Sequence, residues 1–123
     1  TVILTRNAGR TPVPEGEELE KLASHKASMA IFLSVQDIDP VVEKLKKGYG
    51  SGDVPVAIVF KATWDDQEIL YGTLDTIAEK VKKANIKKMS QILVGNFIEG
   101  DYELSKLYDK HFTHKFRKGI DTK

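Results

Sequence analysis

The stretch Pro55-Val-Ala-Ile-Val-Phe-Lys-Ala-Thr63, then Trp64-Asp-Asp66, then Gln67-Glu-Ile-Leu-Tyr-Gly-Thr73 decides the fold of this sequence. The two outer runs are rich in β-branched and aromatic residues, which is typical of strands, and the link between them is polar and short. Two strands joined so directly pair antiparallel, as a hairpin. The sequence therefore predicts one antiparallel pair, whatever the rest of the chain contributes.

Outward from this hairpin, strand patterns alternate with helical patterns. Apolar runs predict strands at residues 2–5, 29–33 and 91–97, and apolar residues at helical spacing predict helices within residues 17–24, 37–47, 74–81 and 104–112. Strands separated by helices usually run parallel in one sheet. We therefore expect an α/β fold with a mixed, mostly parallel sheet of about five strands flanked by helices.

Composition excludes several classes of function. The chain has 123 residues, a formal net charge of +1 and no Cys, which fits one domain without thiolate metal sites or a nucleic-acid-binding surface. No apolar run approaches the roughly 20 residues that span a bilayer. The chain starts inside a strand, at Thr1-Val-Ile-Leu-Thr5, without an initiator Met. We therefore expect a piece of a longer protein that binds neither nucleic acid nor membrane.

The segment Gly48-Tyr-Gly-Ser-Gly-Asp53 resembles a phosphate-binding glycine loop. Such loops follow a strand and open a helix, so that backbone N–H groups face the ligand. This segment instead follows a predicted helix and leads into a strand, where glycine normally ends the helix. We favour that structural interpretation.

Arg6, Arg10 and Thr11 lie in the turn after the first strand. Ligands of open α/β sheets bind beyond the carboxyl ends of strands, and paired arginines suit carboxylates or phosphates. The alternative is two solvated surface arginines, and composition alone favours this alternative.

Other polar clusters favour structural roles. The adjacent acids of Trp64-Asp-Asp66 suit Mg²⁺ in principle, but Asp is also a common turn residue. His111 and His114 share a helical spacing without a carboxylate partner, which makes a poor metal site. The lysines of residues 80–88 are typical of a solvated helix face. We assign no metal ligand and no catalytic base.

Several longer blocks carry a resemblance to a known family. They are Ile3-Leu-Thr-Arg-Asn-Ala-Gly-Arg-Thr-Pro-Val-Pro-Glu15, Met29-Ala-Ile-Phe-Leu-Ser34, Pro55-Val-Ala-Ile-Val59, Gly72-Thr-Leu74 and Ile92-Leu-Val-Gly95. In this order and spacing the chain resembles the C-terminal half of the tetrapyrrole methylases. The first two blocks are similar to the branch that methylates C(11) of precorrin-4 or cobalt-precorrin-4 in cobalamin biosynthesis. The resemblance covers residues 1–98, and residues 99–123 carry little of it.

The resemblance implies a two-domain methyltransferase that binds S-adenosylmethionine between its halves. The half with the glycine-rich donor loop would precede this chain, so the fragment alone would be inactive. Four residues here match cofactor-binding positions: Leu33, Ala62, Gly95 and Asn96. The carboxylate-rich tetrapyrrole substrate favours the functional interpretation of Arg6, Arg10 and Thr11.

The implied reaction is direct displacement, in which a ring carbon attacks the methyl group on sulfonium. Such a site works mainly by positioning its reactants. The resemblance also implies a homodimer. The alternative from another class is a non-catalytic ligand-binding or dimerisation module with the same fold.

Overall fold

The computed structural model of this chain describes residues 1–98. Its elements, in order, are β1 (Val2–Arg6), α1 (Leu19–Ala23), β2 (Ser28–Phe32), η1 (Val35–Asp37), α2 (Ile38–Tyr49), β3 (Pro55–Phe60), β4 (Glu68–Thr73), α3 (Ile77–Lys83), β5 (Ser90–Val94) and η2 (Asn96–Ile98), where η marks a 3₁₀ helix. The strand and helix patterns within residues 1–98 are confirmed, with shifted ends. Among these residues, no helix has the length and apolar character needed to cross a membrane.

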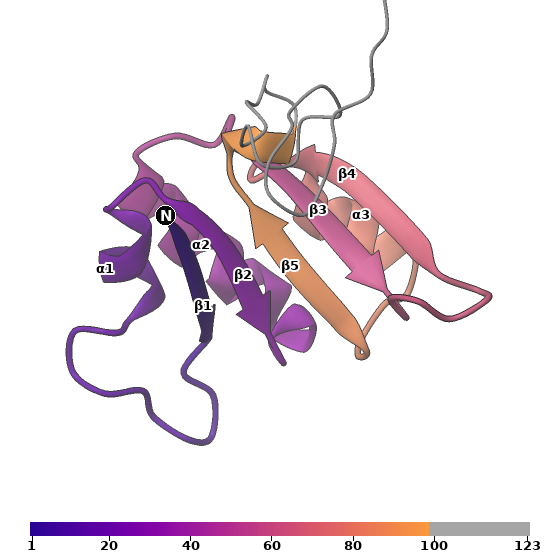
Figure 1. Cartoon of the computed structure of the whole chain (residues 1–123), viewed down its shortest axis with the longest axis horizontal. Coiled ribbons are helices and arrows are strands. Elements are labelled where there is room, and N and C mark those ends of the chain that lie inside the picture. Colours follow the sequence, from indigo (N-terminus) through magenta and orange to yellow (C-terminus); the bar gives the residue numbers. More distant parts are fainter. Residues whose placement is uncertain (99–123) are drawn as a thin grey trace, which may run out of the picture.

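The five strands form one sheet in the order β1-β2-β5-β3-β4 (Figure 1). The predicted hairpin is present, because β3 and β4 pair antiparallel from Pro55 opposite Thr73 to Phe60 opposite Glu68. β5 lies at the centre, antiparallel to both β2 and β3. β1 and β2 form the one parallel pair of the described sheet.

The expectation of a mixed five-stranded α/β sheet is therefore confirmed, but "mostly parallel" was wrong. Each helical connection does return the chain in the same direction, as from β2 through α2 to β3 and from β4 through α3 to β5. Only the strands joined through α1, β1 and β2, are neighbours, because β5 lies between β2 and β3, and β3 lies between β4 and β5. Connection type sets the relative direction of two strands, whereas adjacency depends on the packing of the whole sheet.

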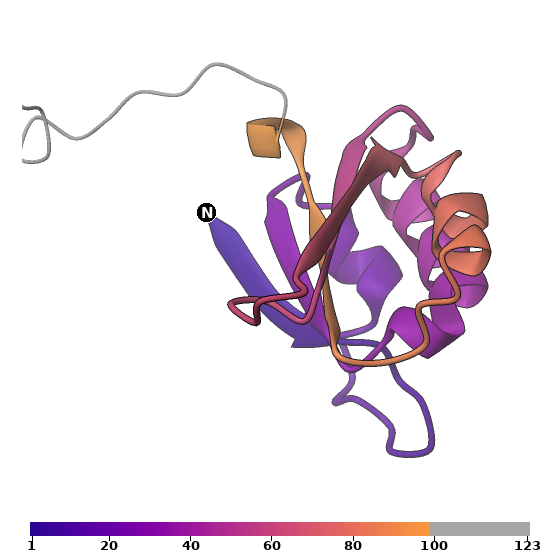
Figure 2. The same ribbon diagram turned by 90° about the vertical axis from the view of Figure 1, so that its right-hand side faces the viewer.

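All three α-helices cover one face of the sheet (Figure 2). The strand side chains on that face include Met29, Val56 and Val94, which lie opposite one another in the ladder and are at most 1% exposed. From α2, Val41 and Leu45 pack into the same cluster and are fully buried. Alternation along each strand therefore directs one apolar set toward the helices, as the period of two requires.

The other face carries a row of small and apolar residues across all five strands, at Leu4, Ala30, Leu93, Ala57 and Tyr71. Leu4 is 69% exposed and Tyr71 is 56% exposed. Within residues 1–98, the α-helices therefore flank the sheet on one face. The helix expected within residues 104–112 lies outside the described residues.

The glycine segment after α2 ends that helix, as the structural interpretation predicts. Gly50 has φ of 75°, in the left-handed region, and its N–H donates to the carbonyl of Lys46 at 2.8 Å. This is the helix-terminating arrangement that glycine favours. Gly48 lies within α2, where its Cα faces Ala23 and Glu20 of the α1 region without room for a side chain. The segment is therefore a site of helix packing and termination.

Candidate functional site

Three strands end at the same edge of the sheet, which we call the carboxyl edge. β1 and β2 are parallel, and β3 points the same way because both β2 and β3 are antiparallel to β5 (Figure 1). Arg6 ends β1, Leu33 follows β2, and Ala62 follows β3. Residues far apart in the sequence therefore lie along the same edge, which is where open α/β sheets bind ligands.

Leu33 is the most unusual residue of this edge. Its side chain is 80% exposed and its φ is 56°. A large apolar residue is seldom so exposed, and a branched L-residue rarely adopts positive φ unless its surroundings impose it. Strained backbone of this kind gathers at ligand-binding sites. The geometry therefore supports Leu33 as a contact residue.

The loop of residues 7–14 borders Leu33. A hollow of about 330 Å³ lies between the two, lined by side chains that include Arg6, Val13, Glu17, Phe32 and Leu33. The hollow is shallow and open to solvent on one side. It joins the predicted substrate loop to a predicted cofactor contact.

Arg6 supports this loop from within. One terminal nitrogen of its guanidinium donates to the carbonyl of Thr11 at 2.9 Å, and the other donates to the carbonyl of Pro12 at 2.9 Å. Arg10 and the Thr11 side chain are exposed. Of the two arginines expected to bind carboxylates, Arg6 therefore shapes the loop, whereas Arg10 remains open to a ligand.

A buried hydrogen-bond network that the sequence analysis missed joins the β1 and β2 turns. The N–H of Asn7 donates to Ser34 Oγ at 3.0 Å, and that hydroxyl donates to the carbonyl of Phe32 at 2.7 Å. Lys44 of α2 donates to Asn7 Oδ1 at 2.7 Å. Asn7 and Ser34 are the two buried polar residues of the described chain. The sequence signal that could have identified Asn7 and Ser34 is their position, one residue past β1 and two residues past β2.

Ala62 lies between two residues with positive φ, Lys61 at 51° and Thr63 at 73°. Its small side chain leaves the backbone of this turn accessible. Lys61 Nζ pairs with Asp66 at 2.7 Å, and that hydrogen bond lowers the pKa of the Asp66 carboxyl. Asp66 thus has a cationic partner in the turn, which favours the structural interpretation over a Mg²⁺ site.

Gly95 and Asn96 lie at the opposite edge of the sheet. β5 runs against β2, so the end of β5 pairs with the start of β2, where Val94 lies opposite Met29. A separate hollow of about 390 Å³ adjoins them and is lined in part by Lys26, Ser28 and Tyr49. The structure therefore brings Arg6, Leu33 and Ala62 to one edge and leaves Gly95 and Asn96 a strand length away.

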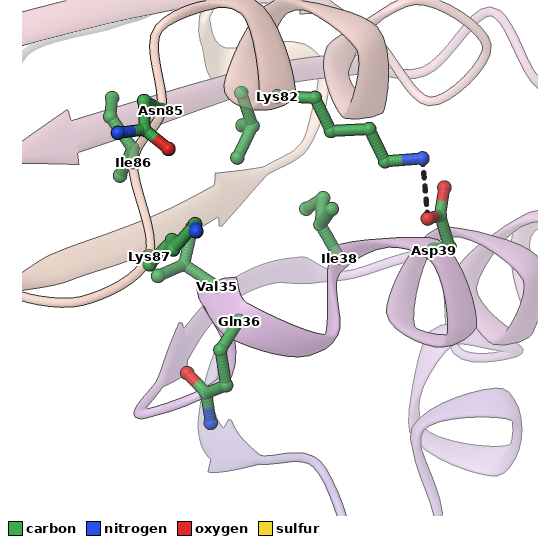
Figure 3. A pocket seen from close by; sticks show the side chains of 9 residues that line it. Val35, Gln36, Ile38, Asp39, Lys82, Asn85, Ile86 and Lys87 are labelled. Carbon is green, nitrogen blue, oxygen red and sulfur yellow. Dashed lines mark ion pairs between the residues drawn. The ribbon is translucent and has the colours of Figure 1, made fainter.

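A further hollow lies in the helical layer, between the start of α2 and the end of α3 (Figure 3). Its floor is apolar, with Val35, Ile38 and Ile86. Lys82 Nζ pairs with Asp39 across its rim at 2.5 Å. Because that ion pair joins the two helices and the charges offset each other, we assign this hollow a structural role.

Comparison with known proteins identifies the family. The family model described as Tetrapyrrole (Corrin/Porphyrin) Methylases matches residues 1–78. The chain belongs to the tetrapyrrole methylases. Its first strand, the loop of residues 7–14, Leu33 and Ala62 all lie within the matched region of this tetrapyrrole methylase.

Curated relatives show which members of the family this chain is similar to. The chain is 54% identical to a cobalt-precorrin-4 C(11)-methyltransferase of Methanocaldococcus jannaschii, over 96% of this chain and 46% of the relative. It is 43% identical to a precorrin-4 C(11)-methyltransferase of Pseudomonas aeruginosa, over 97% of this chain and 48% of the relative. This tetrapyrrole methylase chain therefore spans about half the length of the curated relatives it matches.

Solved structures show the same family similarity. A cobalt precorrin-4 methyltransferase superimposes with a TM-score of 0.78 and 41% identity, covering 81% of this chain and 42% of that chain. A uroporphyrin-III C-methyl transferase of Thermus thermophilus, solved with S-adenyl homocysteine, gives a TM-score of 0.64 at 13% identity, over 80% of this chain and 41% of that one. The second likeness shows the fold alone.

Proposed function

We propose that this chain is the C-terminal half of an S-adenosylmethionine-dependent methyltransferase that methylates C(11) of precorrin-4 or cobalt-precorrin-4. The observation that carries the proposal is 54% identity to an enzyme of that name across nearly the whole of this chain. The full-length protein would then contain an N-terminal half that precedes Thr1 and completes the cofactor cleft. We place it in the cytoplasm.

In this proposal Leu33 and Ala62 contact the cofactor from the carboxyl edge. The exposed Leu33 side chain supplies apolar surface, and the small side chain of Ala62 lets the ligand approach the backbone. Gly95 and Asn96 remain predicted adenosine contacts. Their place at the opposite edge requires that the N-terminal half carry the cofactor toward them, or that they contact it less directly than Leu33 does.

Arg10 and Thr11 are proposed to bind carboxylates of the tetrapyrrole. Both side chains are exposed on the loop that borders Leu33. Arg6 acts through its hydrogen bonds to the carbonyls of Thr11 and Pro12, and so fixes the direction in which the loop presents Arg10. An arginine suits this role because its planar fork makes two directed hydrogen bonds at once.

The methyl donor supplies an electrophilic methyl group, which a ring carbon of the substrate takes as the C–S bond breaks. The chain's own residues contribute alignment, since holding two reactants in register removes much of the barrier. The Asn7–Ser34 hydrogen bond serves that purpose, because it joins the substrate loop to the Leu33 turn. We assign no general base.

The experiment that tests the proposal is calorimetric titration of S-adenosylhomocysteine into this chain and into the full-length protein. We expect binding by the full-length protein and none by residues 1–123 alone. Tight binding by the isolated chain would contradict the shared cleft, and no binding by either would contradict the assignment of the cofactor.

A second experiment tests the substrate role of the two arginines together. Arg6→Ala and Arg10→Ala together should weaken tetrapyrrole binding by the full-length protein and leave S-adenosylhomocysteine binding nearly unchanged. Loss of cofactor binding in the double variant would overturn the substrate role of this loop.

The alternative function is a non-catalytic module that dimerises through the open sheet face. The exposed apolar residues of that face, which include Leu4 and Tyr71, favour it. A homodimer is also part of the enzyme proposal, so oligomeric state alone does not decide between the two. Methyl transfer to a tetrapyrrole by the full-length protein does.

A further inference from the structure

Met89 lies at the carboxyl edge, although it precedes a strand instead of following one. β5 runs against β2 and β3, so its start lies where those two strands end (Figure 1). On one side, Ser90 of β5 pairs with Phe60, the last residue of β3. On the other side, Ile92 pairs with Ile31, the last but one residue of β2. The residue that the start of β5 brings to this edge is therefore Met89.

A backbone hydrogen bond places Met89 directly beside the turn that contains Ala62. The N–H of Lys61 donates to the carbonyl of Met89 at 2.9 Å, which continues the β3–β5 ladder by one step past its last pair. On the β2 side, η1 begins two residues after Leu33 and lies against β5. Met89 is therefore flanked by the segments that carry the two predicted cofactor contacts of this edge, Leu33 and Ala62.

The Met89 side chain is open to solvent and its backbone is strained. The side chain is 44% exposed, and φ is 56°. Non-glycine residues seldom adopt positive φ, and strained backbone of this kind gathers at ligand-binding sites. Six such residues occur within residues 1–98, and four of them lie along this edge, at Leu33, Lys61, Thr63 and Met89. The two features that single out Leu33, exposure and positive φ, therefore recur at Met89.

The order of the strands puts Met89 in the path of a ligand that contacts both Leu33 and Ala62. Leu33 follows β2, Ala62 follows β3, and β5 lies between these two strands. A molecule that reaches both residues passes over the start of β5. Methionine suits such a place, because its unbranched, polarizable thioether adapts to irregular apolar and aromatic surfaces.

We propose that Met89 is a third contact between this chain and the S-adenosyl methyl donor, placed between Leu33 and Ala62. This inference rests on the proposed function and extends it to a residue outside the predicted set. The donor offers an adenine ring and apolar methylene groups, and a methionine side chain can cover either. β5 then contributes to the site through its start, at the same edge as Leu33 and Ala62.

The test compares variants of the full-length protein by calorimetric titration with S-adenosylhomocysteine. Met89→Asn removes the apolar side chain but keeps a residue that tolerates positive φ. Met89→Leu keeps an apolar side chain of similar size. The matched control is Tyr71→Asn, because Tyr71 is also exposed but lies within β4 on the open sheet face. The unfolding temperature of each variant is measured alongside.

We expect Met89→Asn to weaken S-adenosylhomocysteine binding on the order of tenfold, since an apolar side chain no longer covers the ligand. Met89→Leu should restore the affinity to within about threefold of the unaltered protein, as a volume-conserving exchange does. Tyr71→Asn should leave the affinity unchanged. The unfolding temperature of Met89→Asn should not fall, because asparagine adopts this φ with less strain than methionine.

Peroxide oxidation gives an independent measurement, because the two methionines of this chain differ in exposure. Met29 is buried, whereas Met89 is open, and oxidation of methionine follows exposure. In the unliganded full-length protein, peptide mass spectrometry should show Met89 converted to the sulfoxide many times faster than Met29. Saturating sinefungin, a donor analogue without sulfur, should slow the oxidation of Met89 several-fold and leave that of Met29 unchanged.

Several results overturn the inference. One is equal S-adenosylhomocysteine affinity for Met89→Asn and the unaltered protein, and another is oxidation of Met89 that sinefungin does not slow. Slow oxidation of Met89 without ligand would show that another part of the full-length protein covers it. Joint loss of affinity and of unfolding temperature in Met89→Asn would show a structural role. Failure of the proposed function is a distinct result, because the unaltered full-length protein would then bind no S-adenosylhomocysteine.

Discussion

The backbone N–H of Asn7 donates to Ser34 Oγ at 3.0 Å, and this bond joins the turn after β1 to the turn after β2. The two residues are 27 positions apart, and both are at least 92% buried. Leu33 lies between Ser34 and the Phe32 carbonyl that accepts the Ser34 hydroxyl proton. One hydroxyl therefore holds the predicted substrate loop and the predicted cofactor contact, Leu33, in a fixed relative position.

Ser34→Ala should remove the hydrogen bond that joins these two turns. The Asn7 N–H then loses its acceptor in a buried setting, which costs about 1–3 kcal/mol of the free energy of unfolding. Denaturant unfolding of the chain measures the loss, and calorimetry on the full-length protein should show weaker S-adenosylhomocysteine binding. Ser51→Ala is the control, because Ser51 accepts from Asp53 on the exposed surface. An unchanged stability of Ser34→Ala would contradict the role of the hydroxyl.

Leu33→Gly should raise the stability of the chain and lower the cofactor affinity of the full-length protein. Glycine adopts a φ of 56° without strain, and the exposed leucine side chain contributes little burial, so the free energy of unfolding should rise by about 1 kcal/mol. Cofactor affinity of the full-length protein should fall, because the apolar contact is gone. Asn85→Gly, also at φ 56° but in the α3–β5 link, should leave that affinity unchanged. Unchanged affinity in Leu33→Gly would remove Leu33 from the cofactor site.

Gly48→Ala should destabilise the chain although alanine is the better helix former. In an exposed helix this change gains about 1 kcal/mol. Here the added Cβ would collide with Ala23 Cβ and the Glu20 carbonyl, so we expect a net loss of about 1–3 kcal/mol from overpacking. Thermal unfolding measures it, with the neighbouring exposed Lys47→Ala as the control. A rise in the unfolding temperature would show that α1 and α2 can separate at no cost.

Tyr49 should give the chain an alkaline limit to its stability. Its hydroxyl donates to the carbonyl of Ala27 at 2.5 Å, and burial raises the pKa of the phenol from 10.0 to about 12. A pKa raised by folding contributes stability that is complete below pH 10 and is lost as pH rises toward 12. The unfolding temperature should therefore fall across this interval.

Tyr49→Phe identifies the source of that pH dependence. The variant loses about 1 kcal/mol at neutral pH with the hydrogen bond to Ala27, but its stability should fall less steeply between pH 10 and 12. Tyr71→Phe, at an exposed site, should keep the steeper profile. Identical slopes for Tyr49→Phe and the unaltered chain would assign the alkaline limit to other groups.

Much of the candidate site could be predicted because its residues follow strands. Arg6 and Leu33 each lie where an apolar run gives way to a turn, and that position predicts a ligand edge. The sequence could not show that Arg6 and Arg10 play different roles. The guanidinium of Arg6 hydrogen bonds to carbonyls of Thr11 and Pro12, and no local pattern indicates that this arginine supports the loop while Arg10 stays open.

The placement of Gly95 and Asn96 shows a second limit. Both follow a strand, as Leu33 and Ala62 do, so the sequence predicts them in the same terms. β5 runs against its neighbours, and its end therefore lies at the other edge. A strand's direction within the sheet is set by the connections and by which strands pair, not by its own residues.

By itself the sequence determined the elements and the β3–β4 hairpin, because the spacing of apolar residues and short turns act over a few residues. The family followed from the resemblance of longer blocks such as Met29–Ser34. Only the tertiary structure decided that β5 lies between β2 and β3, that helices cover one face of the described sheet, and that Asn7 meets Ser34. Those relations depend on packing between segments far apart in the chain. Which strands become neighbours depends on how the whole core packs, and no single segment of the sequence determines that packing.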